Sequence, residues 1–135
     1  GDMPARVRDI CRASMSDGEV VRCLYDSLAV CFREKLAKLQ QVLGISCQRL
    51  NIVGGGTQDK FLMQLAADAA GIPVTAGPIE ATSIGNIIGQ AIAAGHLAGL
   101  HEAREMVKRS FPVDEYQPDL KQAAIWAEAA TRISR

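Results

Sequence analysis

The sequence predicts a helix-rich α/β fold with a short parallel sheet. Two short apolar runs, Leu50–Val53 and Ile72–Ala76, have the length and the β-branched content of strands. The segment Phe61–Ala70 between them repeats its apolar residues at helical spacing. A strand–helix–strand order predicts parallel strands, because the intervening helix returns the chain to the same end of the sheet.

Two helices are expected before the first strand. Pro4–Cys11 is expected to form a short helix with its proline in the first turn. A long helix is expected over Glu19–Leu43, with either Ser16 or Asp17 as its N-cap. Gly44 supplies the C-terminal stop. The apolar residues of this helix keep helical spacing: Val20, Val21, Leu24, Leu28, Cys31, Phe32, Leu36, Leu39 and Leu43.

The second half of the chain is also expected to be mostly helical. Gly71 ends the helix that follows the first strand, and Pro73 suits the start or the edge of the second strand. After the turn at Gly77 and Pro78, we expect helices over Thr82–Ala94, His101–Ser110 and Asp119–Ile133, with Phe111–Pro118 as a connecting segment. Two strands alone make a poor sheet, so we expect the chain to be part of a larger fold.

Composition narrows the class of protein. A chain of 135 residues fits one domain with a real core. Fifteen Lys and Arg balance fifteen Asp and Glu, which argues against a nucleic-acid binder. No apolar run reaches the length of a membrane span and no signal-peptide pattern is present, so we expect a cytoplasmic protein without a membrane partner. The four cysteines form no Cys-x-x-Cys pair, and no metal site is expected.

The glycines Gly54, Gly55 and Gly56 stand where the first strand gives way to a helix. Glycine lets the backbone approach a ligand closely, and a helix N-terminus offers amides and a positive dipole end to phosphate. A dinucleotide site would need a third glycine where Asp59 stands, although Glu80 lies near the place of a ribose-binding acid. A Walker P-loop is excluded because no Gly-Lys-Ser/Thr follows. A tight structural turn without a ligand remains an alternative.

Longer segments carry a family resemblance. Residues 53–65 read Val-Gly-Gly-Gly-Thr-Gln-Asp-Lys-Phe-Leu-Met-Gln-Leu, and residues 68–74 read Asp-Ala-Ala-Gly-Ile-Pro-Val. Arg-Cys-Leu-Tyr-Asp-Ser-Leu-Ala precedes them at 22–29, and Gly-Pro-Ile-Glu-Ala-Thr-Ser-Ile-Gly-Asn-Ile follows at 77–87. In this order they resemble the adenosine motif and its neighbours in FGGY-family carbohydrate kinases, which belong to the actin-like ATPase superfamily. The last segment resembles the rhamnulokinase branch.

The resemblance implies a partial actin-like ATPase (ribonuclease H-like) lobe. Residues 1–135 then form the C-terminal, nucleotide-side fragment of the second lobe of an FGGY-type sugar kinase. The N-terminal lobe, the start of the second lobe with its catalytic aspartate, and most of the sugar site lie outside the fragment. No catalytic or metal-binding residue is therefore expected in this chain.

The same resemblance implies the nucleotide-binding residues. Gly54, Gly55 and Gly56 match the glycines that line the α-phosphate and the nucleotide. Gln58 and Asp59 continue the cofactor-binding segment, and Asp59 matches a position beside the adenosine that is often asparagine. An alternative is that Asp59 is an ordinary acid at a helix N-terminus, stabilised by the helix dipole.

The expected function is ATP-dependent phosphorylation of L-rhamnulose or a similar ketose or polyol by the parent kinase, with Mg²⁺ bound to the ATP. The fragment would supply the adenosine and α-phosphate side of the cleft and would be inactive alone. The alternative is a non-catalytic interaction or assembly module on a kinase-like scaffold. Such a module could form a homo-oligomer through an exposed strand edge.

Overall fold

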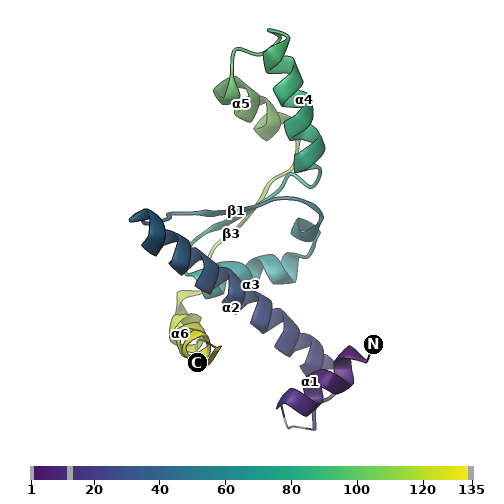
Figure 1. Cartoon of the computed structure of the whole chain (residues 1–135), viewed down its shortest axis with the longest axis vertical. Coiled ribbons are helices and arrows are strands. Elements are labelled where there is room, and N and C mark those ends of the chain that lie inside the picture. The colour runs from purple at the N-terminus through teal and green to yellow at the C-terminus, as the bar shows by residue number, and fades with distance from the viewer. Residues whose placement is uncertain (1, 12–13, 134–135) are drawn as a thin grey trace.

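The computed structural model describes residues 2–11 and 14–133, and Figure 1 shows how their helices and strands are arranged. The elements in chain order are α1 (Met3–Cys11), α2 (Asp17–Leu43), β1 (Leu50–Ile52), the 3-10 helix η1 (Gly55–Gln58), α3 (Lys60–Ala70), β2 (Val74–Ala76), α4 (Ala81–Ala93), α5 (Leu100–Ser110), β3 (Asp114–Tyr116), the 3-10 helix η2 (Leu120–Gln122) and α6 (Ala123–Ile133). The prediction of a helix-rich α/β fold is confirmed.

The sheet contains the predicted parallel pair and one strand that the sequence did not predict. β1 and β2 run parallel with Asn51 opposite Thr75, and α3 connects them. β3 pairs antiparallel with the other side of β2, in the order β1-β2-β3. The expectation of a purely connecting segment at residues 111–118 is therefore wrong, and the sheet is mixed.

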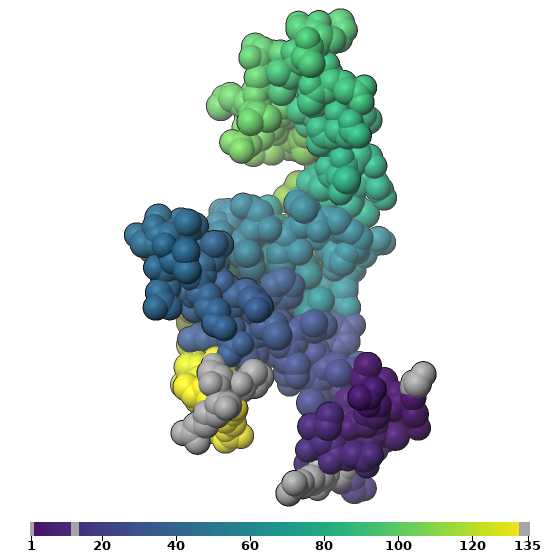
Figure 2. All heavy atoms as spheres, in the orientation of Figure 1, coloured from purple at the N-terminus to yellow at the C-terminus, as the bar shows by residue number. Residues whose placement is uncertain are grey.

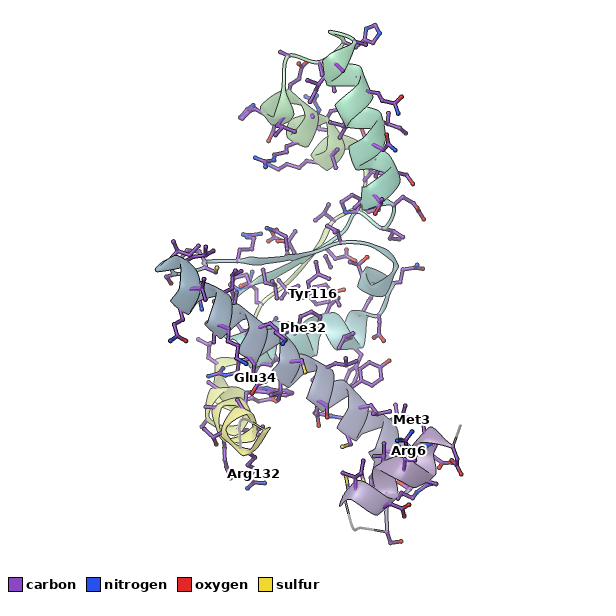
Figure 3. The ribbon with its side chains drawn as sticks, viewed as in Figure 1. Met3, Arg6, Phe32, Glu34, Tyr116 and Arg132 are labelled. Atoms are coloured by element: carbon purple, nitrogen blue, oxygen red, sulfur yellow. The ribbon has the colours of Figure 1, made fainter. Side chains whose placement is uncertain are left out.

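One face of the sheet packs against α2 and α3. Alternate residues of each strand point to this face, as the two-residue period of a strand requires. Phe32 of α2 and Tyr116 of β3 lie between the sheet and the helices, as Figure 3 shows. The buried residues of this cluster are Met63, Ala66, Ala67, Val74 and Ala76. The small alanine side chains let the helix approach the sheet closely.

A second cluster joins α2, α3 and α6 on the side of the helices away from the sheet. Trp126 of α6 is only 4% exposed and packs with Ala29, Val30, Leu65 and Ala69. The long helix α2 therefore contributes residues to both hydrophobic clusters and connects them. Its ends follow the sequence prediction: Ser16 forms a capping box with Glu19, and Gly44 ends the helix in a left-handed conformation.

The helices α4 and α5 form an arm that projects away from the sheet, at the top of the view in Figures 1 and 2. No residue of α4 is buried, and Ile87 is 67% exposed. A Cβ placed on Gly85 or Gly89 would meet no atom of the described chain within 4 Å. No described element therefore packs against these two glycines.

None of the helices in the described residues is both long enough and apolar enough to span a membrane.

Candidate functional site

The glycine turn lies at the carboxyl end of β1, where the chain leaves the sheet. Gly54 has φ +93°, a conformation that L side chains rarely adopt. Its amide donates to the carbonyl of Pro78 at 3.1 Å, and its carbonyl accepts the hydroxyl of Thr57 at 2.7 Å. Thr57 is 6% exposed, so this second bond is shielded from water. Gly54 therefore fixes the entrance of the turn through its backbone.

Gly55 and Gly56 follow as the first residues of η1 and are exposed. A Cβ built on either glycine meets nothing within 4 Å among the described residues. Their N–H groups belong to the first turn of a 3-10 helix, where amides have no partner within the helix. This open strip of backbone could therefore approach a ligand, and it has donors that suit an anionic one.

The helix after the glycines does not present its amides as the sequence suggested. The four residues of η1 intervene, and α3 begins only at Lys60. Asp59 is the N-cap of α3, and its Oδ1 accepts the amide of Leu62 at 3.0 Å. The chain's own carboxylate thus occupies the end of the helix that we expected to receive a phosphate.

The second carboxylate oxygen of Asp59 also has a partner within the chain. Oδ2 accepts the hydroxyl of Tyr25, which reaches it from α2 at 2.5 Å. This hydroxyl, followed by the amide of Leu62, lowers the pKa of Asp59 below the ordinary carboxyl range. The same hydrogen bond raises the pKa of Tyr25. At neutral pH the pair is therefore a carboxylate and a phenol.

Gln58 faces a different surface from Asp59. Its exposed side chain helps to line a pocket of about 280 Å³ beside η1 and the end of β2. The other lining residues are Thr57, Lys60, Ala76, Gly77, Ile79, Pro112 and Asp114. This wall combines polar groups of both charges with the apolar side chain of Ile79. Of the five residues that the sequence predicts for the site, Gly55, Gly56 and Gln58 are exposed, whereas Asp59 faces α2.

The sheet face opposite the helices is open and polar, and sequence reasoning assigned no residue to it. It borders a hollow of about 890 Å³ that extends toward α5, where Arg104 and Lys108 lie. Arg49 spans this face, pairing with Glu115 and donating to the hydroxyl of Thr75 at 2.9 Å. The strand alternation that places Asn51, Thr75 and Glu115 here was readable for β1 and β2 but not for the unpredicted β3.

Across the described residues, no group of three His, Cys, Asp or Glu side chains is placed to hold a metal ion.

Comparison with protein families gives a match over most of the chain. Residues 1–94 match the C-terminal domain of the FGGY family of carbohydrate kinases. Among curated proteins, the chain is 42% identical over 121 residues to a rhamnulokinase of Pectobacterium carotovorum, covering 86% of this chain and 24% of that protein. It is 41% identical over 124 residues to the rhamnulokinase of Enterococcus faecalis, covering 87% of this chain and 25% of that protein.

A more distant relative and a solved structure agree with these matches. The rhamnulokinase of Bacteroides thetaiotaomicron is 36% identical over 133 residues, covering 95% of this chain and 27% of that protein. The crystal structure of xylulose kinase from Rhodospirillum rubrum superposes with a TM-score of 0.69 at 25% identity, covering 90% of this chain and 24% of that one. The chain thus spans about a quarter of the length of the curated relatives it matches.

Proposed function

The chain belongs to the FGGY family of carbohydrate kinases, and we propose that it forms the nucleotide side of the cleft of an ATP-dependent sugar kinase. Its role is to hold ATP while residues outside 1–135 bring a sugar hydroxyl to the γ-phosphate. Phosphoryl transfer of this kind depends mainly on positioning and on charge stabilisation. The chain alone supplies part of the positioning and is therefore inactive by itself.

The exposed backbone of Gly55 and Gly56 carries this proposal. Both glycines leave the space beyond their Cα atoms open, and both offer amides at the carboxyl end of a parallel strand pair. In open α/β sheets, ligands bind at this end of the strands. The α-phosphate would accept hydrogen bonds from these amides, and the adenosine would lie toward Gln58 and its pocket. Mg²⁺ would enter with the phosphates of ATP, as it commonly does in kinases.

For the sugar, we propose L-rhamnulose or a similar ketose. Support comes from the rhamnulokinases of three bacteria, which share 36–42% identity with the chain. These relatives are matched over about a quarter of their length, so the residues that contact sugar hydroxyls are proposed to lie elsewhere in the protein.

The proposal is tested on the full-length protein that contains this chain. ADP release is measured with L-rhamnulose, D-xylulose and glycerol as acceptors, and the ketoses should be preferred to glycerol. A Gly55→Val variant should raise the KM for ATP by roughly tenfold or more, because its side chain fills the space left for the phosphate. Gly18→Val is the matched control, since Gly18 also leaves its Cβ direction open but lies in the first turn of α2.

Two outcomes contradict the proposal. One is an absence of ATP-dependent phosphorylation with every acceptor. The other is an equal KM for ATP in the wild type and Gly55→Val, which would show that the glycine turn is not part of the nucleotide site.

A second candidate role is assembly through the sheet edges. β1 and β3 are edge strands, and an edge strand has backbone groups that can pair with another chain. In this case the protein self-associates, and Gly55→Val leaves the association unchanged. Light scattering at high concentration tests this role, and a clean monomer would count against it.

A further inference from the structure

A cluster of side chains joins the long helix α2 to the residues just after the glycine turn. The phenol of Tyr25 binds the carboxylate of Asp59, and its ring meets the ring of Phe61 edge-on with centroids 5.3 Å apart. The guanidinium of Arg22 lies 5.5 Å from the centroid of the Phe61 ring, on the face of that ring. Arg22 is itself held by Asp26 at 2.8 Å. The hydroxyl of Tyr25 is thus aimed at Asp59 by packing on its ring.

Asp59 is hydrogen-bonded to three elements: η1, α3 and α2. Its amide donates to the carbonyl of Gly56 at 3.2 Å, which closes the last turn of η1. Its carbonyl accepts the amide of Met63, and its Oδ1 accepts the amide of Leu62, which starts α3. Its Oδ2 accepts the hydroxyl of Tyr25 from α2. Asp59 therefore connects the glycine turn to both helices.

The two ends of the glycine turn are anchored differently. The entrance is fixed by backbone bonds, from Gly54 to Pro78 and from Thr57 back to Gly54. The exit at Asp59 is tied to α2 through a single side-chain hydrogen bond, donated by Tyr25. The exit is also bonded to α3 through the amides of Leu62 and Met63, so loss of the Tyr25 bond releases only its tie to α2. With that tie gone and the entrance still in place, we expect the Gly55 and Gly56 amides between the two anchors to gain freedom to shift.

We propose that Tyr25 and Asp59 are positioning residues, which hold the Gly55 and Gly56 amides in place for the nucleotide without touching it. This inference rests on the function proposed above and gives Asp59 a different part from the adenosine contact that the family resemblance implied. Both carboxylate oxygens are engaged by groups of the chain itself, so Asp59 acts on the nucleotide through the turn. Preorganised backbone donors lose effectiveness when they shift by a fraction of an ångström.

Tyr25→Phe in the full-length protein is the central test. It removes one hydroxyl and keeps the ring that packs on Phe61, so the fold should persist. We expect the KM for ATP to rise roughly three- to tenfold, with the KM for the sugar unchanged. The matched control is Tyr116→Phe, because Tyr116 is the other tyrosine of the chain and its hydroxyl has no hydrogen-bond partner among the described residues.

Substitutions of Asp59 separate positioning from direct contact. Asp59→Asn keeps an acceptor for the Leu62 amide, and its amide nitrogen can donate to the Tyr25 oxygen, so it should stay close to the wild type in KM for ATP. Asp59→Ala removes both bonds and should raise that KM at least as much as Tyr25→Phe. If Asp59→Ala raises the KM for ATP while Tyr25→Phe leaves it unchanged, Asp59 contacts the nucleotide directly and the proposal is overturned.

Hydrogen exchange gives a readout that does not depend on kinase activity. The amides of Thr57 and Asp59 are hydrogen-bonded within the turn, to Gly54 and Gly56 respectively. Tyr25→Phe should accelerate their exchange, whereas Tyr116→Phe should not. Equal exchange in wild type and Tyr25→Phe overturns the positioning role even if the protein proves not to be a kinase. Faster exchange in a protein without kinase activity supports the role of Tyr25 and places the failure in the proposed function.

Discussion

Replacing Gly77 with alanine should destabilise the fold by two separate effects. Gly77 follows β2 and has φ +121°, where a residue with a Cβ is strained. Its amide donates to the carbonyl of Ile52 at 2.9 Å, so the residue cannot rotate away without losing this bond between strands. An added Cβ would also lie 2.9 Å from the carbonyl oxygen of Pro112, which is backbone and cannot swing aside as a side chain can.

The size of the effect follows from these two terms. A residue held in an unfavourable backbone region costs about 1–3 kcal/mol. Forcing an extra carbon against packed backbone costs about 1–3 kcal/mol more, since the segment before β3 must shift. We expect Gly77→Ala to lower the free energy of unfolding by about 2–6 kcal/mol, a large share of the stability of a small domain.

Urea denaturation of the 135-residue chain, followed by the fluorescence of its single tryptophan, measures this change. Trp126 is buried between α2, α3 and α6, so its emission reports on the core. Gly89→Ala is the control: Gly89 lies inside α4, an added Cβ meets nothing within 4 Å, and alanine should stabilise the helix by up to about 1 kcal/mol. The same glycine-to-alanine change should then lower the free energy of unfolding at position 77 and raise it at position 89. Equal stability of Gly77→Ala and the wild type would refute the reasoning.

Two further predictions concern the core and the response to pH. Met63 is 1% exposed in the cluster between α3 and the sheet, so Met63→Ala should lower the free energy of unfolding by about 2–5 kcal/mol in the same denaturation assay. The pKa of Asp59 is lowered chiefly by the Tyr25 hydroxyl. The stability that the ionised Asp59 gives to the fold is therefore fully present above the ordinary carboxyl pKa and is lost as pH falls through the lowered pKa. The pKa of Tyr25 is raised by Asp59. The stability that the protonated Tyr25 gives to the fold is therefore fully present below the ordinary phenol pKa and is lost as pH rises through the raised pKa. The stability difference between wild type and Tyr25→Phe should therefore be constant from about pH 5 to pH 9 and shrink outside that range; a difference that changes within it would contradict the ionisation assigned to the pair.

Local sequence signals predicted the helices and the parallel strands well. The helical spacing of α2 extends over 27 residues, and its start at Ser16 and end at Gly44 are set by capping groups next to the helix. Such signals depend only on neighbours in the chain, so they can be read without knowing the fold. The strand pair β1 and β2 was readable for the same reason, because each strand is apolar and ends at a turn.

The third strand had no local signal. β3 reads Asp-Glu-Tyr, a composition that is poor in strand-forming residues, and prolines stand nearby at positions 112 and 118. Its conformation comes from pairing with β2, where Tyr116 lies opposite Val74 and buries part of its ring in the core. A strand formed by its partner rather than by its own propensity can be recognised only when the partner's position is known.

The role of Asp59 in the candidate site likewise depends on a partner that is distant in the sequence. Its place in the glycine motif was read from adjacent residues, but its partner Tyr25 lies 34 positions earlier in the chain. A carboxylate beside a phosphate site would oppose an anionic ligand if it faced that ligand, and it supports the site if it faces away and fixes the turn.

The glycines contribute only backbone, so no side chain can be removed from them to test their function. The site can be disturbed by filling its space, as at Gly55, or by releasing its anchor, as at Tyr25. Since the first change acts on the ligand and the second on the order of the turn, only the second should alter amide exchange when no nucleotide is bound.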